Sequence, residues 1–441
     1  MSRITYINAS HSKTNEVDLI SSYFTVEREF WKKDWKTKRR MRQTYETSLA
    51  KDGMFLAGWN NRVAKFLREE GKSVRWRGED RKAPAENDIT LDGITLKPFQ
   101  REFVTECIEA GRGVILSPTG SGKTVMAGAV LSAYPNDKRL VLCHSKDLLH
   151  QTARKLKKYG LKVSKVGDGN KDTKGDVIVA IVNSWTTLPK RIQLKIKVVI
   201  VDECHHVNSE GSLYYKTLLK LENAWNRFGF TATLPSSKEG KLICEGCLGP
   251  VIRSLSIRKG RRIGIVSNVK VELLDAPYLK TESTTYKDLY KERIINNTGR
   301  NAKIADKVMS LSDEGNTCLI YVKEIEHGKI LKKLIPKSIF VEGAVAGWKR
   351  EKIRRMLDSK EIMSVVTTTA WKEGVDIPSL NAVMNAAGGM SEIGVLQNAG
   401  RGMRVTEEKD KVLIIDFIDH GKYLAEHACN RIAIYAKNKW L

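Results

Sequence analysis

The chain has 441 residues, 41% of them hydrophobic, and it carries 76 Lys and Arg against 51 Asp and Glu, a formal net charge of +25. This length suits about three domains, and the hydrophobic content excludes a wholly disordered chain. No apolar run approaches the roughly 20 residues that span a bilayer, and nothing at the N-terminus resembles a secretory signal, so we expect a cytoplasmic protein without a membrane partner. The positive charge indicates a polyanionic partner, nucleic acid first, with a merely basic enzyme as the alternative.

Residues 1–90 form the first predicted domain, a small α+β module. Between Arg28 and Arg42 it holds eight basic and two acidic residues with tryptophans among them. Basic side chains follow phosphates and aromatic rings stack on exposed bases, so this stretch predicts contact with DNA. A solvated charged face over a small aromatic core is the alternative. The candidate DNA-binding residues here are Lys32, Lys33, Trp35, Arg39 and Arg40.

From about residue 91 the chain alternates apolar strands with amphipathic helices, which is typical of a parallel sheet covered on both faces. The predicted strands of the first part are Val114–Leu116, Leu140–Cys143, Val177–Ile181, Val198–Val201 and Phe228–Thr231. A basic stretch, residues 252–264, interrupts the pattern, which then resumes. We therefore expect two α/β lobes in tandem, residues 91–262 and 263–441.

A glycine-rich turn joins the strand at Val114–Leu116 to an apolar helix, in the order that a phosphate-binding loop requires. Its backbone N–H groups would face phosphate oxygens, and the candidate nucleotide-binding residues are Gly120, Ser121, Gly122, Lys123 and Thr124. The lysine would reach the β- and γ-phosphates of ATP, and the threonine hydroxyl would bind Mg²⁺. The consensus opens with Gly where this chain has Ser117. A chance glycine-rich turn is the alternative.

An acidic pair follows a later apolar strand, as such a loop demands. Asp202 and Glu203 come directly after Val198–Val201. The carboxyl ends of strands in an open α/β sheet are where ligands bind. Asp202 would hold Mg²⁺, and Glu203 would polarise the attacking water.

These residues, with Cys204 and His205 completing a DECH sequence, resemble a superfamily 2 helicase. The resemblance implies two RecA-like lobes and further motifs in a set order. Gln100 resembles the residue that recognises adenine, and Thr231-Ala232-Thr233 resembles the motif that couples hydrolysis to strand movement. Two first-lobe motifs that grip a nucleic-acid strand would include Ser145, Lys146 and Asn183.

The second lobe carries two more motifs of this series. Thr368 would contact a phosphate of the bound strand, and Gly374 and Asp376 would face the nucleotide. Residues 397–404 resemble the sixth motif, whose candidate catalytic residues here are Gln397, Arg401 and Arg404. Two arginines on a second lobe would complete the ATP site only when the lobes close, and closure on each cycle would move the protein along a strand.

Residues 290–304 resemble the entry to the second lobe in the DNA translocases around XPB and phage UvsW. The N-terminal order, WKKDW at residues 31–35 followed by MFLAGWNNRVAKFLREEG at residues 54–71, is similar to the front domain of UvsW-type phage helicases, which act on forks, Holliday junctions and R-loops. This resemblance implies a monomeric, ATP- and Mg²⁺-dependent DNA helicase that unwinds or branch-migrates branched DNA in replication, recombination or repair, in a bacterial or phage-infected cytoplasm. Three alternatives stay open: a duplex-DNA translocase subunit of a restriction or repair complex, an RNA helicase, and a non-hydrolysing scaffold.

The seven cysteines are scattered and odd in number, which suits a reducing compartment and free thiols. Cys244 and Cys247 form a lone CxxC without a second pair of ligands. We expect no metal site there.

Overall fold

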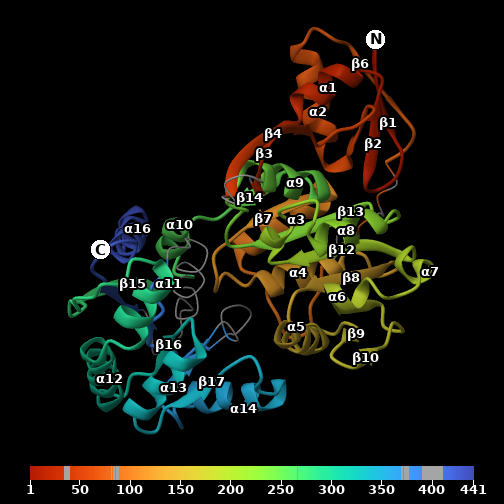
Figure 1. The fold of residues 1–441 in the computed structure, drawn as a ribbon. Helices are drawn as coiled ribbons and strands as arrows, with labels where there is room; N and C mark the ends of the chain where they lie inside the picture. Colours follow the sequence, from red (N-terminus) through yellow and green to blue (C-terminus); the bar gives the residue numbers. More distant parts are fainter. Residues whose placement is uncertain are drawn as a thin grey trace. The chain divides into compact units, whose positions relative to one another are not determined.

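The computed structural model describes residues 1–33, 40–80, 82, 85, 89–265, 267–368, 371, 377–389 and 411–441. Within them the chain forms two compact units, each built on a parallel sheet with flanking helices (Figure 1). The first unit comprises Met1–Leu116, Thr124–His144 and Leu149–Ser254, and the second comprises Ser117–Lys123, Ser145–Leu148 and Leu255–Leu441. The predicted α/β class with two parallel-sheet lobes is confirmed. The predicted domain limits near residues 90 and 262 remain predictions.

The N-terminal segment forms a small mixed sheet of strand order β5-β2-β1-β6, together with a separate hairpin, β3–β4. Its elements are β1 (Ser2–Tyr6), β2 (His11–Thr14), α1 (Val17–Tyr23), β3 (Thr25–Lys33), β4 (Arg40–Ser48), β5 (Met54–Leu56), η1 (Ala57–Trp59), α2 (Asn60–Glu69) and β6 (Val74–Arg77). Helix α2 buries one apolar stripe, Val63, Ala64 and Leu67, against this sheet, as its helical spacing predicts.

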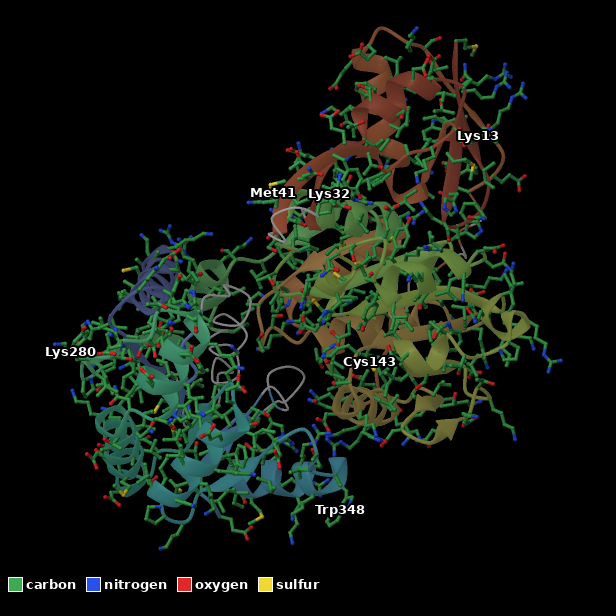
Figure 2. All side chains as sticks on the ribbon, viewed as in Figure 1. Lys13, Lys32, Met41, Cys143, Lys280 and Trp348 are labelled. Atoms are coloured by element: carbon green, nitrogen blue, oxygen red, sulfur yellow. The ribbon has the colours of Figure 1, made fainter. Side chains whose placement is uncertain are left out.

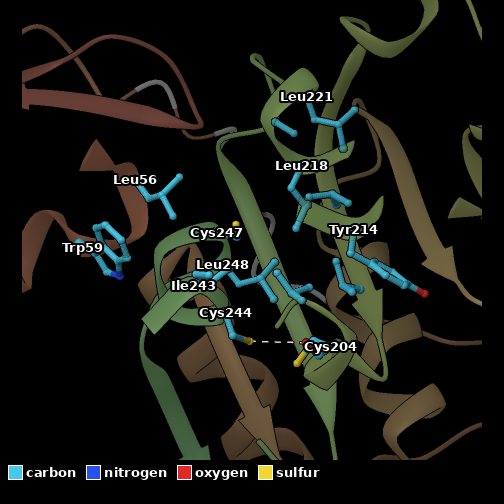
Figure 3. Close-up of a cluster of buried hydrophobic side chains, with 14 of the residues drawn as sticks. Leu56, Trp59, Cys204, Tyr214, Leu218, Leu221, Ile243, Cys244, Cys247 and Leu248 are labelled. Atoms are coloured by element: carbon cyan, nitrogen blue, oxygen red, sulfur yellow. Dashed lines mark hydrogen bonds between the residues drawn. The ribbon is translucent and has the colours of Figure 1, made fainter. Parts of the chain in front are cut away.

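The N-terminal segment shares one hydrophobic core with the sheet that follows it, as Figure 3 shows around Leu56, Trp59, Ile243 and Leu248. Trp59 is fully buried and its indole N–H donates to the Leu242 carbonyl at 2.9 Å. The backbones approach so closely that a Cβ added at Gly58 would lie 2.1 Å from the carbonyl oxygen of Glu245. Only glycine fits there, and the two segments therefore pack as one body.

The first parallel sheet has the strand order β10-β9-β11-β8-β12-β13-β7-β14 within the described residues. Every pair is parallel except β10–β9, so the helices make the crossovers. The elements are α3 (Pro98–Ala110), β7 (Arg112–Leu116), α4 (Lys123–Ser132), β8 (Lys138–Cys143), α5 (Lys146–Lys158), β9 (Val163–Gly167), β10 (Asn170–Lys171), β11 (Val177–Ile181), α6 (Val182–Trp185), α7 (Lys190–Gln193), β12 (Ile196–Asp202), η2 (Cys204–His206), α8 (Leu213–Lys220), β13 (Asn226–Thr231), α9 (Lys238–Leu248) and β14 (Val251–Ser254). The central strands are buried along their length, which explains their continuous apolar sequence.

The second parallel sheet has the order β15-β20-β19-β16-β18-β17, again as far as the chain is described. Its elements are α10 (Ile257–Arg262), β15 (Asn268–Asp275), α11 (Tyr286–Tyr290), η3 (Lys291–Ile295), α12 (Thr298–Asp313), β16 (Cys318–Tyr321), α13 (Ile325–Leu334), β17 (Ile339–Val341), α14 (Gly347–Asp358), β18 (Ser364–Thr367), β19 (Ala382–Asn385), β20 (Lys411–Ile418) and α16 (Leu424–Lys437). Among the described helices of the whole chain, none has the length and apolar character that crossing a membrane requires.

Candidate active site and nucleic-acid interface

The glycine-rich loop leaves the sheet at the carboxyl end of β7. Gly120 and Gly122 have φ values of 86° and 85°, in the left-handed region that favours glycine. Ser117 is not among the residues of positive φ, so its backbone suits any residue, and the consensus glycine is not needed there. Its buried hydroxyl donates to Ser121 Oγ at 2.6 Å, and Ser121 Oγ donates to the Pro118 carbonyl at 2.8 Å. Two serines therefore brace the turn from inside.

Lys123 opens helix α4, directly after the turn, and Thr124 follows it. The Lys123 ammonium donates to the Ser117 carbonyl at 3.1 Å, so it lies across the mouth of the loop. The first N–H groups of a helix have no partner within the helix, and they lie at the positive end of its dipole. This arrangement of turn, cation and helix end suits a polyphosphate.

The acidic pair leaves the sheet at the same edge as the loop. Asp202 pairs in register with Phe230 on β13, and Thr231, the next residue, pairs with Leu116, the last residue of β7. The carboxyl ends of these three neighbouring strands are therefore level. A carboxylate and a hydroxyl are oxygen ligands that Mg²⁺ prefers, so Asp202 and Thr124 fit that ion chemically.

Glu203 has an unusual backbone, with φ 51° and ψ 53° in the left-handed region. Such a conformation costs on the order of 1 kcal/mol or more in a residue with a side chain, and it is found preferentially at functional sites. The Glu203 N–H donates to Asp202 Oδ1 at 3.1 Å, which holds the bend. The bend turns the second carboxylate away from the strand direction and toward β13.

A buried threonine links the acidic pair to the predicted coupling motif. The Thr231 hydroxyl donates to the Thr233 carbonyl at 2.8 Å, and its oxygen lies 3.4 Å from Glu203 Oε2 and 3.1 Å from His205 Nδ1. His205 Nδ1 also lies 3.4 Å from Glu203 Oε2. Sequence patterns placed these segments in the same series, but they did not identify His205 as the side chain that joins them.

Three histidine rings lie in consecutive contact, tilted by 34° and 51° to one another, and the sequence did not predict this cluster. The ring centroids of His205 and His206 are 4.3 Å apart, and those of His206 and His144 are 4.7 Å apart. His206 also stacks against Tyr214, with ring centroids 6.0 Å apart. His144 directly precedes Ser145 and Lys146, so ring contacts connect the acidic pair to a predicted strand-gripping segment. The consecutive histidines after Glu203 were the available signal.

The remaining first-lobe candidates occupy varied positions. Gln100 is 6% exposed, and its Oε1 accepts from the Lys97 N–H at 3.0 Å, closing the first turn of α3. Ser145 caps α5, because its Oγ accepts from the Leu148 N–H at 3.3 Å. Lys146 and Asn183 are exposed. They follow β8 and β11, which end in register at Cys143 and Ile181, so both lie near one sheet edge.

Several predicted residues lie outside the described part of the chain, namely Trp35, Arg39, Gly374, Asp376, Gln397, Arg401 and Arg404. Lys33 and Arg40 are placed only as backbone, pairing in the β3–β4 hairpin. Lys32 is exposed on β3. Thr368 follows β18 but is only 7% exposed, and its N–H donates to the Val341 carbonyl at 3.2 Å. Its expected phosphate contact therefore stays a prediction.

Buried arginines hold the chain where it leaves β19, a feature without a sequence signal. Arg300 donates to Asp419 Oδ1 and to the Ala386 carbonyl, each at 2.9 Å. Arg431 donates to Asp416 Oδ2 at 2.8 Å and to the Gly389 carbonyl at 2.9 Å. These arginine side chains are at most 1% exposed. Buried charges require such pairing, and here they fix the backbone just before residue 390.

The CxxC cysteines lie in the shared core. Figure 3 shows Cys244 directed at Cys204, whose carbonyl accepts from Cys244 Sγ at 3.6 Å. Burial raises the pKa of the Cys247 thiol to about 12, which keeps it protonated and a poor metal ligand. In the described part of the chain, all seven cysteines are free.

Comparison with known proteins adds family relationships to this geometry. Residues 93–236 match the family model described as type III restriction enzyme, res subunit, and residues 300–406 match the helicase conserved C-terminal domain. The chain is 26% identical over 380 residues to the ATP-dependent DNA helicase uvsW of Enterobacteria phage T4, covering 78% of this chain and 75% of that protein. It is 24% identical to the DNA 3'-5' translocase XPB2 of Sulfurisphaera tokodaii, covering 76% and 83% respectively.

A third relative is the putative DNA 3'-5' helicase Rad25 of Haloarcula marismortui, at 25% identity; the match covers 80% of this chain and 57% of that protein. Among solved structures, S. cerevisiae Dbp5 bound to RNA and ADP BeF3 superposes with a TM-score of 0.58 at 15% identity, covering 80% of this chain and 94% of that one. This likeness concerns the fold.

Proposed function

This chain belongs to the superfamily 2 helicases and is an ATP-dependent DNA helicase or translocase, and from that premise we propose that it unwinds or branch-migrates branched DNA. The substrates would be forks, Holliday junctions and R-loops in replication, recombination or repair. The T4 relative is named as a DNA helicase and the archaeal relatives as a DNA translocase and a DNA helicase, which supports DNA as the strand tracked. The net charge of +25 supports binding to a polyanion.

The observation that carries the proposal is the common sheet edge where β7, β13 and β12 end. There we assign Lys123 and the turn at Gly120–Gly122 to the phosphates of ATP, with Gln100 on the adenine. Thr124 and Asp202 would hold Mg²⁺, which when bound would neutralise charge between the phosphates. Glu203 would orient the attacking water and accept its proton.

We further propose that residues of the second lobe complete this chemistry. Arg401 and Arg404, with Gln397, would face the γ-phosphate, and Gly374 and Asp376 would face the nucleotide. An arginine placed on developing phosphate charge contributes about 10³–10⁵ in rate. A site shared by two lobes would make turnover depend on lobe closure, which supports a translocation cycle.

For DNA, we assign Ser145, Lys146, Asn183 and Thr368 to the strand backbone and the N-terminal module to the junction. Contacts to the DNA backbone fix the position of the protein without reading sequence. Because such contacts neutralise phosphates, the affinity for DNA would fall steeply as the salt concentration rises. We also propose that the chain acts as a monomer in the cytoplasm of a bacterium or a phage-infected cell. The seven free cysteines support a reducing compartment.

A matched panel of substrates tests the proposal. ATP hydrolysis and strand separation would be measured on single-stranded DNA, blunt duplex, fork, four-way junction, R-loop and single-stranded RNA, at 50 and 200 mM salt. The proposal predicts the greatest activity on branched DNA and a marked loss of binding at the higher salt. Equal activity on all DNA forms would contradict the branched substrate, and stimulation by RNA alone would contradict DNA as the tracked strand.

A second candidate, a duplex-translocating subunit of a restriction or repair complex, is favoured by the match of residues 93–236 to the res-subunit model. Displacement of a third strand from a triplex measures translocation along duplex without strand separation. Triplex displacement without unwinding of a fork would favour this candidate over the first.

A further inference from the structure

One face of the β3–β4 hairpin exposes three large apolar side chains. Phe30 is 41% exposed, and Met41 and Tyr45 are each 47% exposed. Single exposed apolar residues are common, but adjacent ones on one short element mark a surface that binds something. Figure 2 shows Met41 beside Lys32 on this hairpin, and the two pair in register.

The hairpin register places these residues together. Directly opposed residues of an antiparallel pair lie on the same face. Arg28 opposes Tyr45, Phe30 opposes Gln43, and Lys32 opposes Met41. We call this surface the hairpin face, defined by Arg28, Phe30, Lys32, Met41, Gln43 and Tyr45.

The two faces of the hairpin differ in charge. The hairpin face carries basic side chains and no carboxylate among its six residues. The opposite face carries Glu27, Glu29 and Glu46 together with the basic residues Lys33, Arg40 and Arg42, and Arg42 forms an ion pair with Glu29. An anionic partner would therefore meet the exposed Lys32 and no carboxylate at the outer part of the hairpin face, whereas the other face would present three carboxylates to it.

The hairpin is fixed at its base. Arg28 Nη2 forms ion pairs with Glu210 Oε2 at 2.6 Å and Glu239 Oε1 at 2.5 Å, both in the first unit. Val26, on the same face, is only 8% exposed. The face is thus covered near Val26 and exposed at Phe30 and Met41, and the ion pairs of Arg28 anchor the hairpin to the rest of the first unit.

The two exposed rings lie in contact. The centroids of Phe30 and Tyr45 are 5.7 Å apart with an interplanar angle of 70°. Other aromatic residues of the N-terminal segment serve the core: Trp59 and Phe24 stack at 4.1 Å and are almost fully buried. Phe30 and Tyr45 therefore present ring surface that the core does not use.

We propose that the hairpin face is a stacking platform for unpaired nucleobases of a DNA strand, with Phe30 and Tyr45 stacking on bases and Lys32 on the adjoining phosphate. Stacking tolerates any sequence because every base has a π-face, and a basic neighbour suits the backbone. The proposal rests on the proposed function, because a helicase acting at a junction exposes such bases. The sequence of the basic stretch alone did not identify Phe30 and Tyr45 as the rings that would stack on bases.

The test uses the full chain without nucleotide, and a single-stranded oligonucleotide carrying 2-aminopurine as the probe. Phe30→Ala combined with Tyr45→Ala is compared with wild type, with Phe30→Trp, and with Thr44→Ala on the opposite face. Stacking contributes about 1–3 kcal/mol per base, so the double variant should bind single-stranded DNA about tenfold or more weakly. Quenching of 2-aminopurine should fall with it, while Phe30→Trp and Thr44→Ala should behave like wild type.

Several results would overturn the platform. Unchanged affinity for the single strand, or an equal loss for blunt duplex, would show that the rings do not read unpaired bases. A wild-type dimer that becomes monomeric in the double variant by sedimentation would identify the face as a contact between copies. Circular dichroism and DNA-independent ATP hydrolysis should match wild type, because the changes lie on an exposed surface. The binding assay needs no ATP, so a negative result can be distinguished from a failure of the proposed ATP-dependent helicase activity.

Discussion

His205 Nδ1 lies 3.1 Å from Thr231 Oγ1, so the residues after the acidic pair touch the strand that follows it in the sheet. The same hydroxyl oxygen lies 3.4 Å from Glu203 Oε2. A movement of the proposed catalytic carboxylate of Glu203 would therefore change the contacts of Thr231, and through them those of Thr233. This connection gives the proposed coupling of hydrolysis to strand movement a physical route.

The first prediction concerns that hydroxyl. Thr231→Ala removes the shared oxygen from a fully buried position, and an unmade buried hydrogen bond costs about 1–3 kcal/mol. We expect DNA unwinding to fall by about fivefold or more, with a smaller loss of ATP hydrolysis. Thr231→Ser keeps the hydroxyl and is the control. Equal losses in hydrolysis and unwinding would contradict a coupling role.

The second prediction concerns the cluster of His144, His205 and His206. His206→Ala removes the ring between His144 and His205, whereas His206→Phe keeps an aromatic ring there. Aromatic pairs are worth about 0.5–1.5 kcal/mol beyond burial. We expect the alanine variant to need several-fold more DNA for half-maximal ATPase stimulation, with DNA-independent hydrolysis unchanged.

The phenylalanine variant should restore most of the stimulation by DNA. If both variants lose stimulation equally, the imidazole nitrogens of His206 matter and its ring contacts do not. If neither variant loses stimulation, the histidine contacts do not connect the predicted strand-gripping segment after His144 to the acidic pair.

The third prediction concerns the joint between the N-terminal segment and the first sheet. Trp59 is fully buried between them, and Trp→Ala changes in cores typically cost about 3–5 kcal/mol. We expect Trp59→Ala to lower the urea midpoint of unfolding strongly and Trp59→Phe to lower it less. If Trp59→Ala destabilised only the N-terminal segment and left the urea midpoint of the rest of the first unit unchanged, a shared core would be contradicted. Deleting residues 1–90 would expose the same apolar surface, so point variants are the cleaner probes of this segment.

The fourth prediction concerns a buried histidine of the second unit. His327 is fully buried, and its Nε2 lies 2.9 Å from Asn301 Oδ1. Burial, with the nearby Arg300 charge, lowers the pKa of His327 to about 3. The unfolded chain, with an ordinary histidine pKa of 6.5, binds this proton below pH 6.5 and the folded chain does not. Stability is therefore expected to fall as pH drops from 6.5 toward 3, by about 2 kcal/mol at pH 5.

Urea unfolding at pH 7 and pH 5 checks this, with His327→Gln as the comparison. Glutamine does not titrate and can still donate to Asn301. The variant should lose less stability between the two pH values than wild type does. An equal loss in both proteins would assign the acid sensitivity to other groups.

Much of this architecture could be predicted because its signals are local. The strand at Val177–Ile181 matches its predicted bounds, since a continuous apolar run between turns identifies a buried parallel strand. The positions of the glycine-rich loop and the acidic pair could be predicted for the same reason, because each lies directly after such a strand. Their shared edge follows from parallel topology.

The features that escaped prediction depend on contacts between distant residues. The β3–β4 hairpin was not predicted, because its charged and aromatic residues do not follow the regular alternation of polar and apolar residues that indicates a strand. The link from His205 to Thr231 and the pairing of Arg300 with Asp419 join residues 26 and 119 positions apart. No local pattern encodes such pairs. The burial of Thr368 likewise depends on a neighbouring strand, β17, where the Val341 carbonyl accepts the Thr368 N–H.

The central claim is that the glycine-rich loop and the acidic pair form an ATP-hydrolysing site that DNA stimulates. It is tested most directly by steady-state ATP turnover with and without forked DNA, for wild type, Lys123→Ala and Glu203→Gln. Lys138→Ala, at the amino end of β8 on the opposite sheet edge, is the control. We predict DNA-stimulated turnover in wild type and Lys138→Ala, and a loss of about 100-fold or more in both site variants. Unchanged turnover in Lys123→Ala and Glu203→Gln would contradict the account.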